Sequence, residues 1–304
     1  MDNKKVIFIV IIAAFMLIGL SVILSAMFFP EGSITAFFGS NVALVKLEGE
    51  IITEGSSYFG TKSAFDVVSE IEQADEDSSI AAILLEINSP GGSVVGSKQI
   101  ADALKSAKKP VVSWISDTGA SGAYLAAAST DYIVADSASL TGSIGVISIL
   151  PNYSGLMEKI GLKFEVLKKG DYKDIGNPFR EMTDAEKKLF YDSLEEIFSE
   201  FKDSVKEYRK GKLDLKEFNK IADGRFITGK QALDLGLIDS LGTRKEAINK
   251  AAELAGVKGK PNVMDFSGSS FEFGNLFSEA GYFLSKGFVS GLQANASIQT
   301  VKIQ

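Results

Sequence analysis

A single serine stands among small residues in the segment "DTGASGAYLAAAST", residues 117–130. Ser121 lies there at a predicted change from a strand to a helix, with Gly119 and Gly122 close beside it. A serine hydroxyl at a helix start, next to a glycine N–H that can stabilise an oxyanion, suits acyl transfer. A structural alternative also fits the pattern: Ser121 could cap the helix while the small residues allow close helix packing.

The base for such a serine cannot be histidine. The chain has 304 residues with no histidine and no cysteine, which excludes a Ser–His pair, a thiolate nucleophile and Cys-type zinc sites. A neutral lysine can act as the base, and burial favours the neutral amine by moving its pKa from about 10.4 toward about 7–8. Lys173 is a candidate, because the Gly- and Pro-containing loop of "KKGDYKDIGNPFR" (168–180) follows a predicted strand at 163–169. Composition alone does not separate it from the other lysines.

A second glycine-containing segment, "NSPGG" (88–92), follows a predicted buried strand and precedes a helix. Backbone N–H groups collect at such a position, and glycines let another backbone approach closely. A tight strand-to-helix turn without any catalytic role is the alternative. The spacing of "GGSVVGSK" excludes the two common phosphate-binding motifs.

These groups must be positioned by an alternation of strands and helices. The run "IAAILLEIN" (80–88) is almost entirely apolar, which is typical of a parallel strand buried on both faces. The alternation predicts an α/β domain with a mainly parallel sheet. The predicted strands are 42–47, 80–88, 110–115 and 132–136, and the predicted helices are 65–74, 93–107 and one that starts at Ser121.

A second region begins near Pro151 and contains a long predicted helix. Thr183 and Glu186 have the spacing of a capping box at its start. The apolar residues that follow recur at helical spacing, and we expect them to face the core or another subunit rather than a cofactor. They are Leu189, Phe190, Leu194, Ile197, Phe198, Phe201, Val205 and Tyr208.

The N-terminus predicts a membrane anchor. Val6–Phe29 contains no charged residue and is long enough to cross a hydrocarbon core of about 30 Å. A cleavable signal peptide is the alternative, but its apolar region usually has about 7–15 residues. Lys4 and Lys5 precede the span and Glu31 follows it, which predicts a cytoplasmic N-terminus.

We therefore expect four parts in the chain. They are a cytoplasmic N-terminus and transmembrane anchor (1–30), a connector (31–40), an α/β domain (41–262) and a C-terminal tail (263–304). The tail could be a flexible arm or a docking segment. The 39 acidic and 32 basic residues give a net charge of −7, which argues against nucleic acid as a partner.

Five segments of the sequence form an ordered set: "NSPGG", "DTGASGAYLAAAS", "SLTGSIGV", "KGDYKDIGNPFREMTDAE" and "DGRFITGKQALDLGLIDSLG". Their order and approximate spacing resemble those of the signal peptide peptidase A family of serine-lysine membrane proteases. The chain resembles the short, single-domain form of that family over roughly residues 40–260. The resemblance implies a Clp/crotonase-like spiral of ββα units, preceded by one transmembrane helix.

The resemblance also implies roles for particular residues. Ser121 would be the nucleophile and Lys173 the general base, with Ser143 orienting the lysine amine. The backbone N–H groups of Gly91 and Gly122 would form the oxyanion hole, without a metal or another cofactor. Many relatives have Gly-Gly-Tyr after the nucleophile where this chain has Gly-Ala-Tyr, a difference of one methyl group.

The expected function is that of a membrane-anchored serine endopeptidase whose extracytoplasmic domain degrades cleaved signal peptides and other hydrophobic peptides. The resemblance favours a homo-oligomer in which Lys173 reaches Ser121 of the adjacent chain, although the spacing leaves a site within one chain open. Two alternatives are a crotonase-like acyl-CoA hydratase and a catalytically silent, membrane-tethered scaffold. An external domain would have no access to cytoplasmic CoA, which argues against the hydratase.

Overall fold

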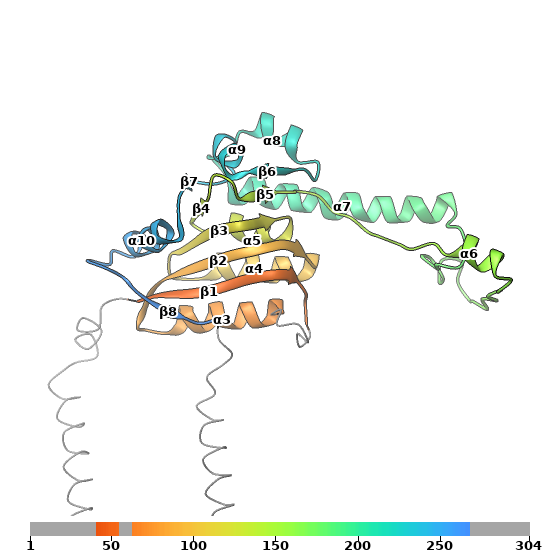
Figure 1. Ribbon diagram of the computed structural model, residues 1–304, viewed down its shortest axis with the longest axis horizontal. Helices are drawn as coiled ribbons and strands as arrows, with labels where there is room; N and C mark the ends of the chain where they lie inside the picture. The colour runs from red at the N-terminus through yellow and green to blue at the C-terminus, as the bar shows by residue number, and fades with distance from the viewer. Residues whose placement is uncertain (1–40, 55–62, 268–304) are drawn as a thin grey trace, which may run out of the picture. The chain divides into compact units, whose positions relative to one another are not determined.

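A central sheet organises the chain in the computed structural model, which describes residues 41–54 and 63–267 (Figure 1). Within these residues, the strands pair in the order β6-β5-β3-β2-β1-β8, while β4 pairs with β3 and β7. All pairs are parallel except β5 with β6. The strands are β1 (Asn41–Ile51), β2 (Ile80–Gly92), β3 (Val111–Ala120), β4 (Tyr132–Ala135), β5 (Leu140–Gly142), β6 (Phe226–Thr228), β7 (Ser240–Leu241) and β8 (Asn262–Asp265).

Helices cover both faces of this sheet. α3, α4 and α5 pack against β1, β2 and β3, and α10 packs against the same strands through its alanine-rich side. α7 packs against α5. The helices are α3 (Ala64–Glu76), α4 (Val94–Ser106), α5 (Gly122–Ala128), α6 (Ser154–Lys159), α7 (Asp184–Tyr208), α8 (Leu215–Ile221), α9 (Gly229–Asp234) and α10 (Arg244–Leu254).

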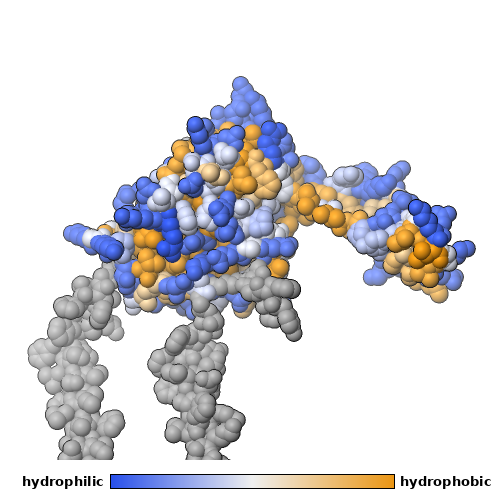
Figure 2. Space-filling model, in the orientation of Figure 1, coloured by the Kyte–Doolittle hydropathy of each residue, from blue (hydrophilic) through white to orange (hydrophobic). Residues whose placement is uncertain are grey.

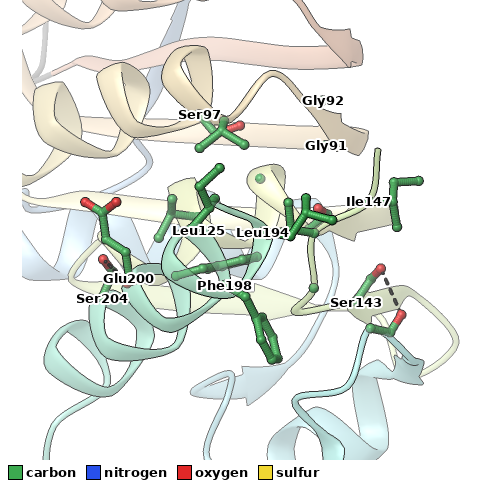
Figure 3. A pocket seen from close by; sticks show the side chains of 18 of the residues that line it. Gly91, Gly92, Ser97, Leu125, Ser143, Ile147, Leu194, Phe198, Glu200 and Ser204 are labelled. Carbon is green, nitrogen blue, oxygen red and sulfur yellow. Dashed lines mark hydrogen bonds between the residues drawn. The ribbon is translucent and has the colours of Figure 1, made fainter. Parts of the chain in front are cut away.

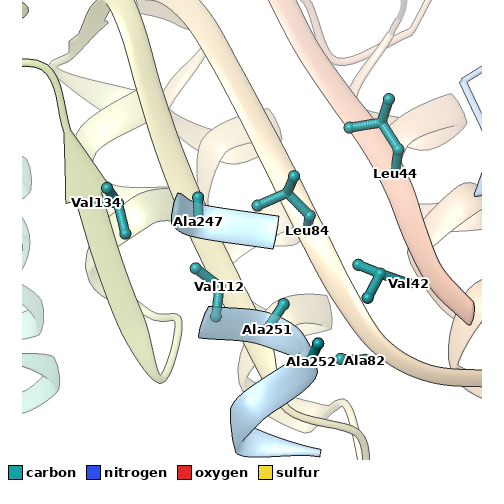
Figure 4. Close-up of a cluster of buried hydrophobic side chains, with 9 residues drawn as sticks. All are labelled: Val42, Leu44, Ala82, Leu84, Val112, Val134, Ala247, Ala251 and Ala252. Atoms are coloured by element: carbon teal, nitrogen blue, oxygen red, sulfur yellow. The ribbon is translucent and has the colours of Figure 1, made fainter. Parts of the chain in front are cut away.

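The continuous apolar run of β2 follows from this double cover. Successive side chains of a strand point to opposite faces, so both sets must be apolar when both faces are buried. Ala82 and Leu84 belong to the cluster beneath α10 (Figure 4). The intervening Ile83 is also fully buried. The cluster consists of Val42, Leu44, Ala82, Leu84, Val112, Val134, Ala247, Ala251 and Ala252.

Most of the predicted elements are confirmed. The four predicted strands coincide with β1 to β4, and the first two predicted helices coincide with α3 and α4. The strand predicted at 163–169 is wrong, because these residues are exposed and have no regular structure. Their alternating apolar side chains resemble a strand, but a strand also needs a hydrogen-bonding neighbour, and none of the described strands pairs with them.

The sheet continues to Asp265, slightly beyond the predicted domain end at 262, because β8 pairs with β1. The predicted anchor (6–29), the connector (31–40) and the tail from residue 268 lie outside the described residues. Within the described part, no helix is long and apolar enough to cross a membrane.

α7 links two different regions of the chain. It has 25 residues, and its predicted capping box is confirmed by the bonds of Thr183 and Glu186. At its C-terminal end the buried Arg209 donates to both carboxylate oxygens of Asp239 at 2.8 and 3.1 Å. Residues 148–182, which we call the arm, lie beside the other end and include α6 (Figure 1).

Candidate active site

Three neighbouring strands lead, at their carboxyl ends, to all of the predicted site residues except Lys173. β2 ends in Gly91 and Gly92, β3 runs into Ser121, and β5 runs into Ser143. The strands are adjacent in the order β5-β3-β2, and the backbone N–H of Ser121 donates to the carbonyl of Gly142 at 2.9 Å. Parallel strands end at one edge of a sheet, so segments far apart in the sequence meet here.

Ser121 has a backbone conformation that serine rarely adopts. Its φ is 53° and its ψ is −125°, and within the described residues only Ser121 and Ser143 are non-glycine residues with positive φ. Such a conformation costs about 1–3 kcal/mol and occurs preferentially at functional sites. The Ser121 side chain makes no capping bond to α5, so the alternative in which it caps the helix is not supported.

The glycines around Ser121 permit close backbone contacts. A Cβ atom on Gly91 would lie 2.8 Å from both the nitrogen of Gly122 and the Cβ of Ser121. A Cβ atom on Gly122 would overlap the Ser97 hydroxyl of α4, so the expected close packing is also present. The N–H groups of the first helical turn have no partner within their helix, and Gly122 is the first residue of α5. The N–H of Gly91, in contrast, donates to the Ser89 hydroxyl at 3.1 Å.

Ser143 is held beside this edge by the segment before β6. Its N–H donates to the carbonyl of Arg225 at 2.9 Å, and its hydroxyl donates to the carbonyl of Gly224 at 3.2 Å (Figure 3). A hydroxyl that donates its proton in this way keeps its lone pairs available. It can therefore accept a hydrogen bond from an amine placed next to it.

Ser121, Gly91, Gly122 and Ser143 all line one cavity of about 920 Å³. Much of the remaining lining is apolar and comes from α5, α7 and the segment after β5 (Figure 3). An apolar cleft with a few convergent polar groups is typical of a site for a small molecule or peptide. The apolar lining includes Leu125, Val146, Ile147, Leu194, Phe198 and Phe201.

Charged groups also reach this cavity. Lys98 of α4 forms an ion pair with Glu200 of α7, and both residues line the cavity. On another part of the lining, hydrogen bonds from Arg225 hold the pKa of the Asp223 carboxyl at about 2. Lys98 is the one lysine among the described lining residues, and its ammonium is already bound to a carboxylate.

Lys173 does not lie in this cavity. It is exposed in a turn of the arm. None of the described residues that line the cavity belongs to the arm. The cavity and the turn that carries Lys173 lie at different points along α7. Phe198 in the middle of the helix lines the cavity, whereas the arm lies beside the first turn at Asp184. These two α7 residues are roughly 20 Å apart along the helix.

The apolar stripe of α7 is divided between the core and the cavity, which its helical spacing could not predict. Its apolar stripe was expected to face the core or another subunit, but only Phe201 and Val205 of that stripe are buried, and Leu194, Ile197 and Phe198 line the cavity. The helical spacing identified the stripe correctly. It could not show that the middle of the stripe faces Ser121.

Family comparisons add independent information. The family model described as peptidase family S49 matches residues 103–258, and the model described as Clp protease matches residues 43–138. "Putative protease MJ0651" of Methanocaldococcus jannaschii is 37% identical over 268 residues, which cover 86% of this chain and 84% of that protein. The chain belongs to peptidase family S49.

Two further relatives place the chain more closely within peptidase family S49. "Putative signal peptide peptidase SppA" of Enterococcus faecium is 33% identical over 69% of this chain and 63% of its own length. "Protease 4" of Haemophilus influenzae is 31% identical over 78% of this chain, but the match covers only 38% of its own length. The predicted resemblance to the signal peptide peptidase A family is therefore confirmed.

Membership of peptidase family S49 makes the chain a serine protease. The described residues form a mixed α/β sheet, and the match to Clp protease makes this sheet consistent with the predicted Clp/crotonase-like fold class. The S49 match contains Ser121, Ser143 and Lys173, and Gly91 lies within the Clp protease match.

Proposed function

We propose that this S49 protease is a membrane-anchored endopeptidase that uses Ser121 as nucleophile and Lys173 as general base. The observation that carries the proposal is the position of Ser121: strained, half-buried and on an apolar cavity beside Gly122 and Ser143. A silent scaffold would have no need to maintain this backbone conformation.

The reaction would proceed through an acyl-enzyme. As the Ser121 Oγ attacks the peptide carbonyl carbon, its proton passes to the neutral amine of Lys173. The N–H of Gly122 would stabilise the resulting oxyanion, and Gly91 would join it by exchanging its present bond to Ser89. The ammonium then protonates the leaving amine. Water hydrolyses the ester, with the same lysine accepting the proton of the water.

A second copy of the chain would supply Lys173. The cavity contains no residue of its own arm, whereas the arm carries several exposed apolar side chains (Figure 2). Large exposed apolar patches commonly mark protein interfaces. Docking the arm on a neighbour would bury this surface and bring Lys173 beside Ser143 of that neighbour, whose hydroxyl can accept from an amine.

The substrates would be cleaved signal peptides and other hydrophobic peptides. The apolar lining of the cavity supports this substrate class, since an extended apolar segment can bury its side chains there. The anchor at 6–29 would hold the domain on the extracytoplasmic side of the membrane, where such peptides remain after export. Protease added outside intact cells should then digest the domain, and complete protection at a verified accessible surface would reject this topology.

Covalent labelling tests the nucleophile. A fluorophosphonate should label the wild-type chain and a Ser193→Ala control, whose substituted serine lies exposed on α7, but not Ser121→Ala. Hydrolysis of a fluorogenic apolar peptide should fall by about 10⁴-fold or more in Ser121→Ala. Labelling that does not depend on Ser121, or unchanged hydrolysis, would leave the scaffold alternative in place.

Mixing two inactive variants tests the shared site. Ser121→Ala chains and Lys173→Ala chains should each be inactive, but mixed assemblies should regain sites with one intact serine and one intact lysine. If subunit exchange is demonstrated and the mixture remains inactive, Ser121 and Lys173 do not act across chains.

A further inference from the structure

Arg180 links the turn that carries Lys173 to α7 through side-chain hydrogen bonds. The Arg180 Nε donates to Asp174 Oδ2 at 2.8 Å, and its Nη1 and Nη2 donate to the two carboxylate oxygens of Glu186 at 2.8 and 2.5 Å. Nη2 also donates to the Asp174 carbonyl and Nη1 to the Glu181 carbonyl. All five N–H groups of the guanidinium are thus engaged, in the fork geometry that arginine provides and lysine does not.

Both ends of this link are well anchored. Glu186 is buried, and its Oε2 also accepts from the Thr183 N–H as part of the capping box of α7. Asp174 directly follows Lys173, and the Asp174 side chain is only 12% exposed. Arg180 therefore joins the turn at 170–176 to the first turn of a 25-residue helix.

The same contacts keep the neighbouring carboxylate away from the lysine. Asp174 uses Oδ2 for Arg180 and Oδ1 for Lys168, which is 2.5 Å away. These hydrogen bonds lower the pKa of Asp174 well below its usual range, so the group remains a carboxylate. The amine of Lys173 has no hydrogen-bonding partner among the described residues and stays free to meet another surface.

We propose that Arg180 is a positioning residue for the protease reaction: it holds the 170–176 turn on α7 so that the Lys173 amine is presented, unpaired, to the active site. This inference rests on the proposed role of Lys173 as general base. Arg180 acts only through the turn and would not touch the substrate.

The first test is steady-state kinetics of the full-length Arg180→Gln variant with a fluorogenic apolar peptide. We expect kcat to fall by about 10- to 100-fold with little change in KM, because a displacement near 1 Å at a reacting group has this effect. Arg180→Lys should recover only part of the loss. Lys188→Gln is the matched control, since it also removes a cation from an ion pair at this end of α7 but has no bond to the turn. A kcat for Arg180→Gln equal to that of the control would overturn the proposal.

Chain mixing separates positioning from general damage. The reference is a mixture of Ser121→Ala chains with Lys173→Ala chains. A mixture of Arg180→Gln chains with Ser121→Ala chains should reach the same activity, because the Ser121→Ala chain supplies the intact turn. Arg180→Gln mixed with Lys173→Ala should stay low, because the only lysine comes from the altered turn. Equal activity of these two Arg180→Gln mixtures, whether high or low, would contradict a positioning role.

The reference mixture tells the two proposals apart. If it stays inactive while subunits exchange, the proposal of a site shared between chains is rejected. The role of Arg180 is then tested by the kcat of the Arg180→Gln variant alone. In that case Asp174→Asn supplies the second measurement. Adding it to Arg180→Gln should reduce kcat no further than Arg180→Gln alone, because both changes break the same link.

Discussion

The sheet and the arm contain similar apolar residues but use them in opposite ways. In β2, Ile83 and Leu84 are completely buried between two layers of helices. In the arm, Ile149 is 84% exposed and Leu167 is 90% exposed. Ser121 is therefore built on the part of the chain that is stabilised by its own core, whereas Lys173 is carried by a part whose apolar surface the described residues leave uncovered.

This difference separates two requirements of the proposed mechanism. The proposed nucleophile needs a rigid frame that can maintain a strained backbone, and burial of the surrounding core provides it. The base needs a neutral amine in an apolar site, and an exposed lysine acquires such surroundings only when another surface covers it. The arm leaves many of its apolar side chains exposed, so a second molecule could bury them and surround the lysine.

The largest expected contrast concerns stability. Leu84→Ala should lower the free energy of unfolding by about 2–5 kcal/mol, because it leaves a cavity in the core cluster. Leu167→Ala should change it by less than about 0.5 kcal/mol, as for other exposed positions. Denaturant unfolding can be followed by Trp114, the one tryptophan of the chain, which packs against the core cluster. An equal loss in both variants would mean that the arm belongs to the same folding core.

A glycine from each region gives the next contrast. Gly91→Ala should destabilise the chain by about 1–3 kcal/mol, because φ is +96° and the new Cβ would lie only 2.8 Å from the Gly122 nitrogen and from the Ser121 Cβ. It should also reduce kcat by about 100-fold or more through displacement of the oxyanion donors. Gly155→Ala in α6 is the control, since a Cβ there meets no atom within 4 Å. Full activity in Gly91→Ala would remove this strand end from the proposed oxyanion hole.

Replacing Ser121 by glycine should have a smaller effect on stability, and one of opposite sign. Ser121→Gly should be more stable than Ser121→Ala by roughly 1 kcal/mol, because relief of about 1–3 kcal/mol of backbone strain exceeds the entropy that glycine adds to the unfolded chain. Both variants lack the Ser121 hydroxyl, so thermal unfolding compares strain alone. If Ser121→Ala is the more stable of the two variants, the positive φ at this position stores no strain.

The smallest effect is expected at the arm in acid. Hydrogen bonds from Arg180 and Thr183 hold the pKa of Glu186 at about 2, below its ordinary value of 4.5. A lowered pKa stabilises the folded arm above pH 4.5, and this contribution is lost as the pH falls toward 2. Hydrogen exchange at 170–186 should therefore accelerate relative to β2 over this range. Glu186→Gln should show less of this pH dependence, and an identical profile would exclude Glu186 as its source.

Much of the fold could be predicted because local patterns reflect burial. The run at 80–88 predicted a strand covered on both faces, and the spacing of Thr183 and Glu186 predicted the start of α7. The strand predicted at 163–169 failed for the opposite reason. Alternation describes one chain segment, but a strand exists only when a second segment provides hydrogen bonds.

The sequence by itself determined the chemical groups available to this protein. The absence of histidine and cysteine restricted the base to a residue such as lysine, and the motifs around Ser121, Ser143 and Lys173 identified the family. Only the tertiary structure decided which of these groups meet. Ser121 and Ser143 come together because parallel strands end at one edge of the sheet, a contact between distant segments that no local spacing specifies. Lys173 remains apart from them because Arg180 ties its turn to the far end of α7, and a rigid helix keeps its two ends separated.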